Sequence, residues 1–216
     1  MTRRAHPAEA GHRADRFEAS GLACRRGGRL LLEAVDWQLG AGDALLLKGA
    51  NGSGKSSLLR LIAGFLQPAA GNLRHAGLDV FADLGRWRSR FHFIGYQNAL
   101  KLGLDVTENL HAVSALLGGD SGRIEAALDR FGLLELAAQP ARFLSSGQRR
   151  RVGLARLVAV DRPVWLLDEP ATGLDAANRA RLEATIAAHR SAGGMVVVAT
   201  HGDLDVPDAH ILDLGG

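Results

Sequence analysis

Eight residues near the start of the chain have the types and spacing of a phosphate-binding loop. The stretch GANGSGKS, from Gly49 to Ser56, fits the pattern G-x-x-x-x-G-K-[ST] and stands between an apolar run and a helical pattern. In such a loop backbone N–H groups point at phosphate oxygens, the lysine reaches the β- and γ-phosphates, and the hydroxyl ligates Mg²⁺. An ordinary glycine-rich turn is the alternative, which the flanking elements disfavour. The predicted nucleotide-binding residues are Gly49, Ala50, Asn51, Gly52, Ser53, Gly54, Lys55, Ser56 and Ser57.

Two acidic residues follow a second apolar run. In VWLLDE, Asp168 comes after four apolar residues and Glu169 is next. A carboxylate at the end of a neighbouring buried strand can complete a magnesium site, so Asp168 and Ser56 are predicted metal ligands. Glu169 is predicted to be the general base that orients and deprotonates the attacking water. The alternative is a strand that simply ends in exposed acids.

Gln97 and His201 also follow apolar runs, FHFIGY and MVVVAT. We predict that His201 contacts the γ-phosphate, because α/β folds bind ligands at the carboxyl ends of their strands. The amide of Gln97 can position water or complete the magnesium shell, so it is both a candidate catalytic residue and a candidate metal ligand. Neither residue by itself indicates a function, because a lone histidine after a strand is usually structural and a glutamine in a loop is common.

A capped helix start lies between these runs, in LSSGQRRRVGLAR, Leu144 to Arg156. Ser145 or Ser146 can accept hydrogen bonds from the free backbone N–H groups there. A capped helix N-terminus with a serine hydroxyl is also an anion site. In the interpretation of this stretch as an ordinary helix start, exposed arginines can follow.

The apolar runs have the length of strands. Because they are continuous, they indicate strands covered on both faces, as in a parallel sheet flanked by helices, and hence an α/β fold. Alternation between Leu30 and Leu39 predicts a half-exposed antiparallel strand and a further N-terminal β layer. The helical pattern from Asn98 to Val160 predicts an inserted helical subdomain at roughly 98–160. The runs begin at Ala44, Phe91, Val164, Met195 and His210.

Length and composition favour one compact domain, because 216 residues with 47% apolar side chains suffice for a buried core. We expect a flexible tail over 1–16 and one domain over 17–216. The sequence has no apolar run of about 18 residues and no visible signal peptide, so membrane contact is expected only through partners. Cys24, the single cysteine, excludes an internal disulfide. No aromatic-studded basic stripe supports direct binding of nucleic acid.

In chain order the motifs resemble those of the ATP-binding-cassette (ABC) ATPases, from about Leu22 onward. The resemblance implies a P-loop NTPase fold with an N-terminal antiparallel β layer and an inserted helical subdomain, ATP and Mg²⁺ as ligands, and a head-to-tail homodimer. In this family the Ser-x-Gly-Gln helix start binds the γ-phosphate of ATP held by the other subunit, which assigns Ser145, Gly147 and Gln148 to nucleotide binding in trans. The motifs are the P-loop, Gln97, LSSGQ at Leu144, LLDEP at Leu166, GLD at Gly173 and His201.

Two positions depart from the family pattern. Ser146 stands at the second glycine of L-S-G-G-Q, a small polar replacement that keeps the anion site. Many members place an aromatic ring under adenine, whereas LACRRGGRLLL has Arg25 or Arg26 there. A guanidinium can stack on a base, so Arg26 is included among the nucleotide-binding residues.

Further segments resemble the cytochrome c maturation ATPase family (CcmA), among them IGYQNALK, TENL and LSSGQRRRVGLARL. This resemblance implies two ATP-hydrolysing copies that work with CcmB-, CcmC- and CcmD-like proteins at the cytoplasmic face of the inner membrane, in haem handling or export. The sequence itself has no haem motif, and scattered histidines such as His75, His92, His111 and His189 favour surface or packing roles. Alternatives are the ATPase of a drug, lipid or lipoprotein exporter, a cassette ATPase acting on DNA, and a regulatory module without turnover.

Overall fold

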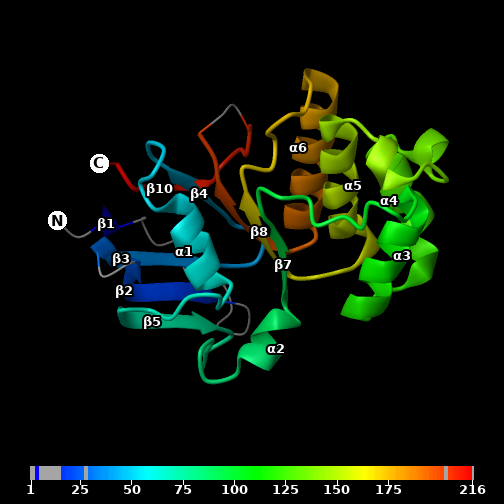
Figure 1. The fold of residues 1–216 in the computed structure, drawn as a ribbon. Helices are drawn as coiled ribbons and strands as arrows, with labels where there is room; N and C mark the ends of the chain where they lie inside the picture. Colours follow the sequence, from blue (N-terminus) through cyan, green and yellow to red (C-terminus); the bar gives the residue numbers. More distant parts are fainter. Residues whose placement is uncertain (1–2, 5–15, 27–28, 202–203, 216) are drawn as a thin grey trace.

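Two five-stranded sheets build the chain in the computed structural model, which describes residues 3–4, 16–26, 29–201 and 204–215. Figure 1 shows the two sheets with helix α1 between them and the remaining larger helices beyond the second sheet. Sheet A has the order β1 (Arg3–Arg4), β3 (Arg29–Leu39), β2 (Phe17–Arg26), β5 (Ala70–His75), β6 (Leu78–Asp79). Sheet B has the order β10 (His210–Asp213), β4 (Ala44–Lys48), β9 (Met195–Ala199), β8 (Val164–Asp168), β7 (Phe91–Ile94).

Sheet A is the N-terminal antiparallel layer that the sequence predicts. Strand β2 pairs antiparallel with both β3 and β5. Along β3, Val35, Trp37 and Leu39 are buried, whereas Asp36 and Gln38 between them are half-buried. The alternation therefore marks a strand with one face on the core, as predicted.

Sheet B is entirely parallel among the described strands, and its five strands are the five apolar runs. Alternate residues of β4, β8 and β9 enter different cores. Leu45, Leu166 and Val197 pack with α1 (Lys55–Ile62) and sheet A, whereas Leu46 and Leu167 pack with the helices on the other face. Continuous apolar strands follow because both faces of this sheet are covered.

The second face of sheet B is covered by α5 (Ser146–Ala159) and α6 (Ala176–Ser191), and α3 (Val106–Leu117) and α4 (Ile124–Arg130) pack on α5. Helix α3 begins with a capping box between Asp105 and Glu108 and ends at Gly118, whose φ of 69° suits a glycine. The short helix α2 (Leu84–Arg88) precedes β7. Single 3₁₀ turns lie at Ser121–Arg123, Leu134–Leu136 and Ala141–Phe143. The α/β fold with an inserted helical subdomain is confirmed.

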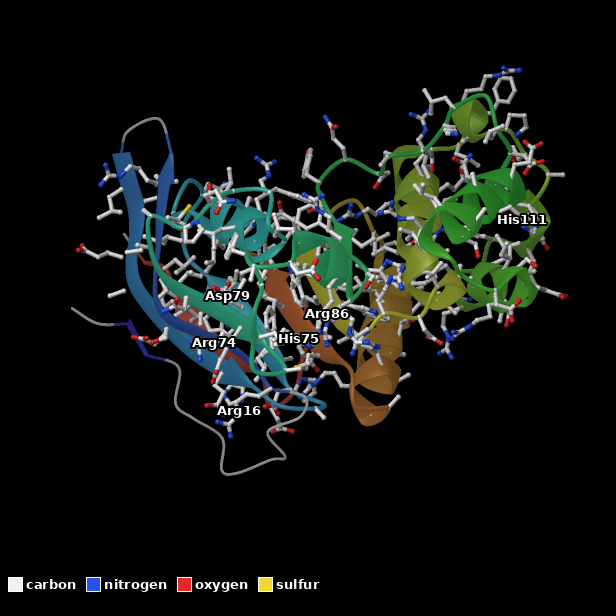
Figure 2. All side chains as sticks on the ribbon, turned by 90° about the horizontal axis from the view of Figure 1, so that it is seen from below. Arg16, Arg74, His75, Asp79, Arg86 and His111 are labelled. Carbon is white, nitrogen blue, oxygen red and sulfur yellow. The ribbon has the colours of Figure 1, made fainter. Side chains whose placement is uncertain are left out.

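The histidines without ligand spacing have the packing and surface positions expected of them. His75 packs edge-on against Phe17, and the ring of His189 stacks on Trp165 at 3.8 Å. His92 is buried, and His111 is exposed on α3 (Figure 2). Three of the four thus have packing positions and one lies on the surface.

The N-terminal residues are only partly described. Arg3 and Arg4 pair in parallel with Val35 and Asp36 of β3, while residues 1–2 and 5–15 lie outside the described residues, so the tail over 1–16 stays a prediction. Among the helices that the structure describes, none is long and apolar enough to span a bilayer. Cys24 lies on β2 of sheet A and is buried in the core.

Candidate nucleotide site

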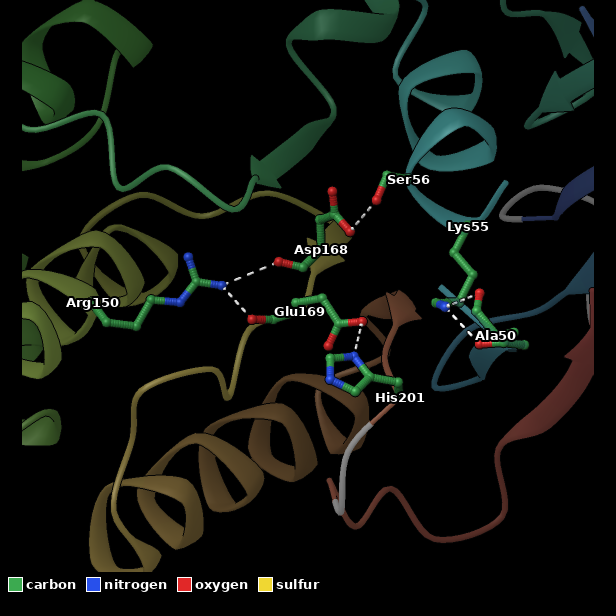
Figure 3. A network of polar contacts seen from close by, with 8 residues as sticks. Ala50, Lys55, Ser56, Arg150, Asp168, Glu169 and His201 are labelled. Carbon is green, nitrogen blue, oxygen red and sulfur yellow. Dashed lines mark hydrogen bonds and ion pairs between the residues drawn. The ribbon is translucent and has the colours of Figure 1, made fainter. Parts of the chain in front are cut away.

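The predicted site residues come together at one edge of sheet B. The P-loop follows β4, Asp168 ends β8, His201 follows β9, and the loop with Gln97 follows β7. The strands run parallel, so their carboxyl ends meet at the same edge. Figure 3 shows Asp168, Glu169 and His201 facing the start of α1 across this edge.

The P-loop has the backbone that its glycines allow. Gly49, Gly52 and Gly54 have φ angles of 145°, 85° and 101°, in the region that side chains disfavour. A Cβ on Gly49 would lie 2.6 Å from Ser53 Oγ, so a larger residue would block the turn. Ser53 Oγ is buried and has no hydrogen-bond partner among the described residues. An orphaned hydroxyl inside the loop fits a donor to a phosphate oxygen.

Lys55 extends its side chain over the P-loop. Its Nζ donates hydrogen bonds to the carbonyl oxygens of Gly49 at 2.6 Å and Ala50 at 3.0 Å (Figure 3). The ammonium thus lies over the mouth of the loop and beside the N-terminus of α1, where backbone N–H groups and the helix dipole favour an anion.

Ser56 and Asp168 place two oxygen ligands side by side. Ser56 Oγ donates a 2.9 Å hydrogen bond to Asp168 Oδ1. Burial raises the pKa of Asp168, and the Ser56 hydrogen bond opposes that rise. A hydroxyl next to a carboxylate fits Mg²⁺, which binds hard oxygen ligands and usually keeps several waters. Among the described residues, no group of three or more His, Cys, Asp or Glu side chains lies close enough together to hold a metal ion.

Glu169 and His201 form a direct pair, in which His201 Nδ1 lies 2.7 Å from Glu169 Oε1. The Glu169 side chain is 16% exposed, whereas that of His201 is 57% exposed. The imidazole therefore orients a largely buried carboxylate from the solvent side. This is the arrangement that a general base with a fixed direction requires.

Ser145 and Gln148 close the N-terminus of α5 with a capping box. Ser145 Oγ accepts from the Gln148 N–H at 3.2 Å, and the Ser145 N–H donates to Gln148 Oε1 at 2.7 Å. A Cβ on Gly147 would lie 3.0 Å from the Gly173 carbonyl oxygen, so this position favours glycine. Here the Gln148 side chain caps its own helix, and exposed Ser145 offers the hydroxyl.

Comparison with known proteins agrees with this geometry. The family model described as "ABC transporter" matches residues 32–172. The chain belongs to the ABC transporter family. Proteins named "Cytochrome c biogenesis ATP-binding export protein CcmA" are 48% identical over 202 residues in Paramagnetospirillum magneticum and 46% identical over 194 residues in Paracoccus denitrificans. These alignments cover 92% and 90% of this chain, and 93% and 86% of the relatives.

Solved structures share the ABC fold. A putative ABC transporter ATP-binding protein from Pyrococcus furiosus superposes with a TM-score of 0.81 at 24% identity, over 92% of this chain and 97% of its own. A second structure, titled as the ATP binding subunit of an ABC transporter, gives 0.78 at 23% identity, over 86% and 79%. At this identity the two structures support the fold alone.

For two of the predicted site residues, the described structure shows no hydrogen bond to the rest of the site. Gln97 lies in the loop after β7 with an exposed side chain. Arg26 ends β2, where its backbone pairs with Arg29, but its side chain lies outside what the structure describes. Stacking of Arg26 on adenine therefore stays a prediction.

Sequence reasoning missed Arg150. Exposed arginines can follow a helix start of this kind, but Arg150 is only 4% exposed. Arg150 is buried because it lies on the same face of α5 as Leu154 and Leu157, which face the core. The spacing i, i+4, i+7 was the available signal, since it puts the three side chains on one helix face.

Proposed function

We propose that this chain hydrolyses ATP as the nucleotide-binding subunit of a membrane ABC complex for c-type cytochrome biogenesis. The observation that carries ATP hydrolysis is the convergence of Lys55, Ser56, Asp168, Glu169 and His201 at one edge of sheet B. The relatives named for cytochrome c biogenesis, which are 48% and 46% identical over 93% and 86% of their length, support the cellular role.

The chain's residues divide the chemistry among themselves. The P-loop N–H groups and Lys55 bind the β- and γ-phosphates. Ser56 and Asp168 hold Mg²⁺, and Gln97 completes its shell. When bound, Mg²⁺ neutralises charge that develops on the phosphate oxygens. Glu169 accepts a proton from the attacking water while His201 orients the carboxylate.

The site is completed by a second copy of the chain. The helix start at Ser145 is exposed and capped, so its hydroxyl and N-terminal dipole are available to an anion from outside the chain. We place Ser145 and Gly147 of one copy against the γ-phosphate bound by the P-loop of the other. Because ATP contacts both copies only in the closed dimer, its binding drives closure and its hydrolysis permits opening.

The proposed partners are CcmB-, CcmC- and CcmD-like membrane proteins, with the chain peripheral at the cytoplasmic face of the inner membrane. Purification of a tagged chain from membranes, followed by identification of the associated proteins, tests this assignment. Recovery of such partners, together with loss of c-type cytochromes when the gene is deleted, is expected. Recovery of the membrane subunit of a drug, lipid or lipoprotein exporter instead would show that the chain is the ATPase subunit of that exporter.

ATP hydrolysis itself is tested with purified chain and Mg²⁺. We expect phosphate release that is abolished in Lys55→Ala, because this substitution removes the ammonium at the mouth of the P-loop. Absence of turnover in the wild-type protein, alone and with its membrane partners, would contradict the proposal.

A further inference from the structure

Arg150 uses its whole guanidinium in a buried network. A guanidinium carries five N–H donors in a planar fork. In the described structure the donors meet five acceptors, and the surroundings leave the side chain almost no contact with solvent. Nε donates to the Pro170 carbonyl at 3.0 Å, Nη1 to the Gly95 carbonyl at 2.8 Å and to Asn98 Oδ1 at 3.2 Å, and Nη2 to the carbonyls of Asp168 at 3.2 Å and Glu169 at 2.8 Å.

These acceptors belong to two loops that carry the chemistry. Gly95 and Asn98 lie on either side of Gln97, and the other three acceptors are the backbone carbonyls of 168–170. Arg150 itself lies in α5, five residues after Ser145. One side chain therefore joins the helix that begins at Ser145 to both loops.

The bond to Glu169 holds an unusual backbone. Glu169 has a φ of 47°, in the left-handed region that non-glycine residues rarely adopt. Its N–H donates to the Ala199 carbonyl at 2.9 Å, and its carbonyl accepts from Arg150. This conformation turns the Glu169 carboxylate toward His201, as Figure 3 shows.

The neighbouring arginine makes a different set of contacts. Arg151 Nη1 donates to the carbonyls of Phe131 at 2.9 Å and Gly132 at 2.7 Å, at the end of α4. These bonds stay within the helical subdomain. The same residue type one position away thus stabilises the subdomain without reaching 95–98 or 168–170, and it provides a matched comparison.

We infer that Arg150 is a positioning residue for hydrolysis, which fixes the Gln97 loop and the backbone of Glu169 relative to α5. The inference rests on the proposed ATP hydrolysis at this site. Arg150 makes no hydrogen bond to the P-loop among the contacts described. Its loss should therefore change the placement of Glu169 and leave phosphate binding by Lys55 intact.

Steady-state kinetics and nucleotide binding of Arg150→Met and Arg150→Lys test the inference. For Arg150→Met we expect kcat to fall about 10- to 100-fold, the range that a misplacement of about 1 Å produces. The Kd for a fluorescent ATP analogue, measured with Mg²⁺, should stay within about twofold, because the P-loop is untouched. Arg150→Lys should recover part of kcat, since an ammonium supplies three of the five donors.

Hydrogen exchange provides a second readout that does not depend on turnover. We expect the amides of 169–172 to exchange faster in Arg150→Met, because the Glu169 and Pro170 carbonyls lose their partner. In Arg151→Met we expect lower thermal stability with kcat and exchange at 169–172 unchanged. If Arg150→Met does not fold, Asn98→Ala removes one acceptor of the same network and should still lower kcat with Kd unchanged.

The outcomes separate this inference from the proposed function. A wild-type protein without ATPase activity would overturn the proposed function. If the wild type hydrolyses ATP and Arg150→Met keeps its kcat within about twofold, the positioning role is wrong. An equal loss of kcat in Arg151→Met would also overturn it, since that loss would report only on the stability of α5.

Discussion

Ser56 Oγ donates a 2.9 Å hydrogen bond to Asp168 Oδ1, although the two residues are 112 positions apart in the sequence. The contact joins the first turn of α1 to the carboxyl end of β8. Both oxygens face the same edge of sheet B as Lys55 and Glu169 (Figure 3). The P-loop and the carboxylates proposed for catalysis therefore already lie together in a single copy of the chain.

Asp168→Asn should raise the Mg²⁺ concentration needed for half-maximal ATPase activity. The substitution replaces a charged ligand by a neutral amide. Changes to residues that only hold a metal's ligands in place already weaken metal affinity about 10- to 100-fold, so we expect an increase of at least about tenfold. A Mg²⁺ titration of the ATPase rate measures the effect. Ser89→Ala removes a hydroxyl from the exposed C-terminus of α2 and should leave the titration unchanged; an unchanged Asp168→Asn titration would remove Asp168 from the metal site.

Glu169→Gln should lower kcat by about 10²- to 10⁴-fold, the usual contribution of a general base. The amide keeps the size of the side chain but cannot accept the proton from water. Equilibrium binding should show that the variant still holds ATP and accumulates as an ATP-bound dimer on size-exclusion chromatography. Glu135→Gln, an exposed change in the helical subdomain, is the control. Wild-type turnover by Glu169→Gln would exclude this residue as the base.

His201 should matter through Glu169. His201→Ala removes the 2.7 Å contact that orients the carboxylate, so we expect kcat to fall by about tenfold or more. In a double-mutant cycle with Glu169→Gln, the two losses should be far from additive, because the residues act as one unit. Additive losses in that cycle would show that His201 acts independently, for example on the phosphate alone.

The burial of His92 should make the stability of the folded protein sensitive to acid. Burial lowers its pKa from 6.5 to about 4, while the hydrogen bond to the Val160 carbonyl opposes this and the charges of Arg156 and Arg162 lower it further. The unfolded chain therefore gains a proton at His92 below about pH 6.5, whereas the folded protein does not until about pH 4. The free energy of unfolding is therefore highest above about pH 6.5 and falls as the pH drops from there to about 4. The full decrease due to His92 is about 3 kcal/mol.

Denaturant unfolding at several pH values between about 4 and 7 tests this expectation. His92→Gln keeps an N–H donor for Val160 but does not titrate, so its free energy of unfolding should depend less on pH. The exposed His111→Gln should retain the wild-type dependence. Identical pH profiles for wild type and His92→Gln would show that other groups cause the acid sensitivity.

The order of the elements was readable from the sequence because each signal was local. A strand covered on both faces leaves a continuous apolar run, as Leu45 to Leu47 and Val164 to Leu167 do, and a half-exposed strand leaves alternation, as β3 does. The P-loop was readable because glycine and lysine at fixed spacing have one common use. Convergence of the site then follows from parallel strands that end at one edge.

The remaining features depend on contacts between distant segments. Nothing local marks the 2.7 Å approach of His201 to Glu169 or the left-handed φ of Glu169. The sequence likewise leaves open whether the side-chain amide of Gln148 binds a ligand or caps α5, because a glutamine at this position is suited to either role. Arg150 looked like a surface arginine because its five acceptors come from residues 18 to 55 positions away. The helix spacing of Arg150 to Leu154 and Leu157 indicates that it is buried, but its hydrogen-bond partners, like the other features named here, follow only from the tertiary structure.

Paired inactive variants test the shared site most directly. Lys55→Ala and Ser145→Arg chains, each with a different affinity tag, are co-expressed and purified through both tags, so that each dimer holds one of each. In such a dimer the P-loop of the Ser145→Arg chain faces the intact Ser145 of its partner, which restores one complete site. Nucleotide binding by Ser145→Arg alone serves as the folding control. We expect ATPase activity well above that of either variant alone, whereas a mixed dimer as inactive as its parents would contradict a site shared between two copies.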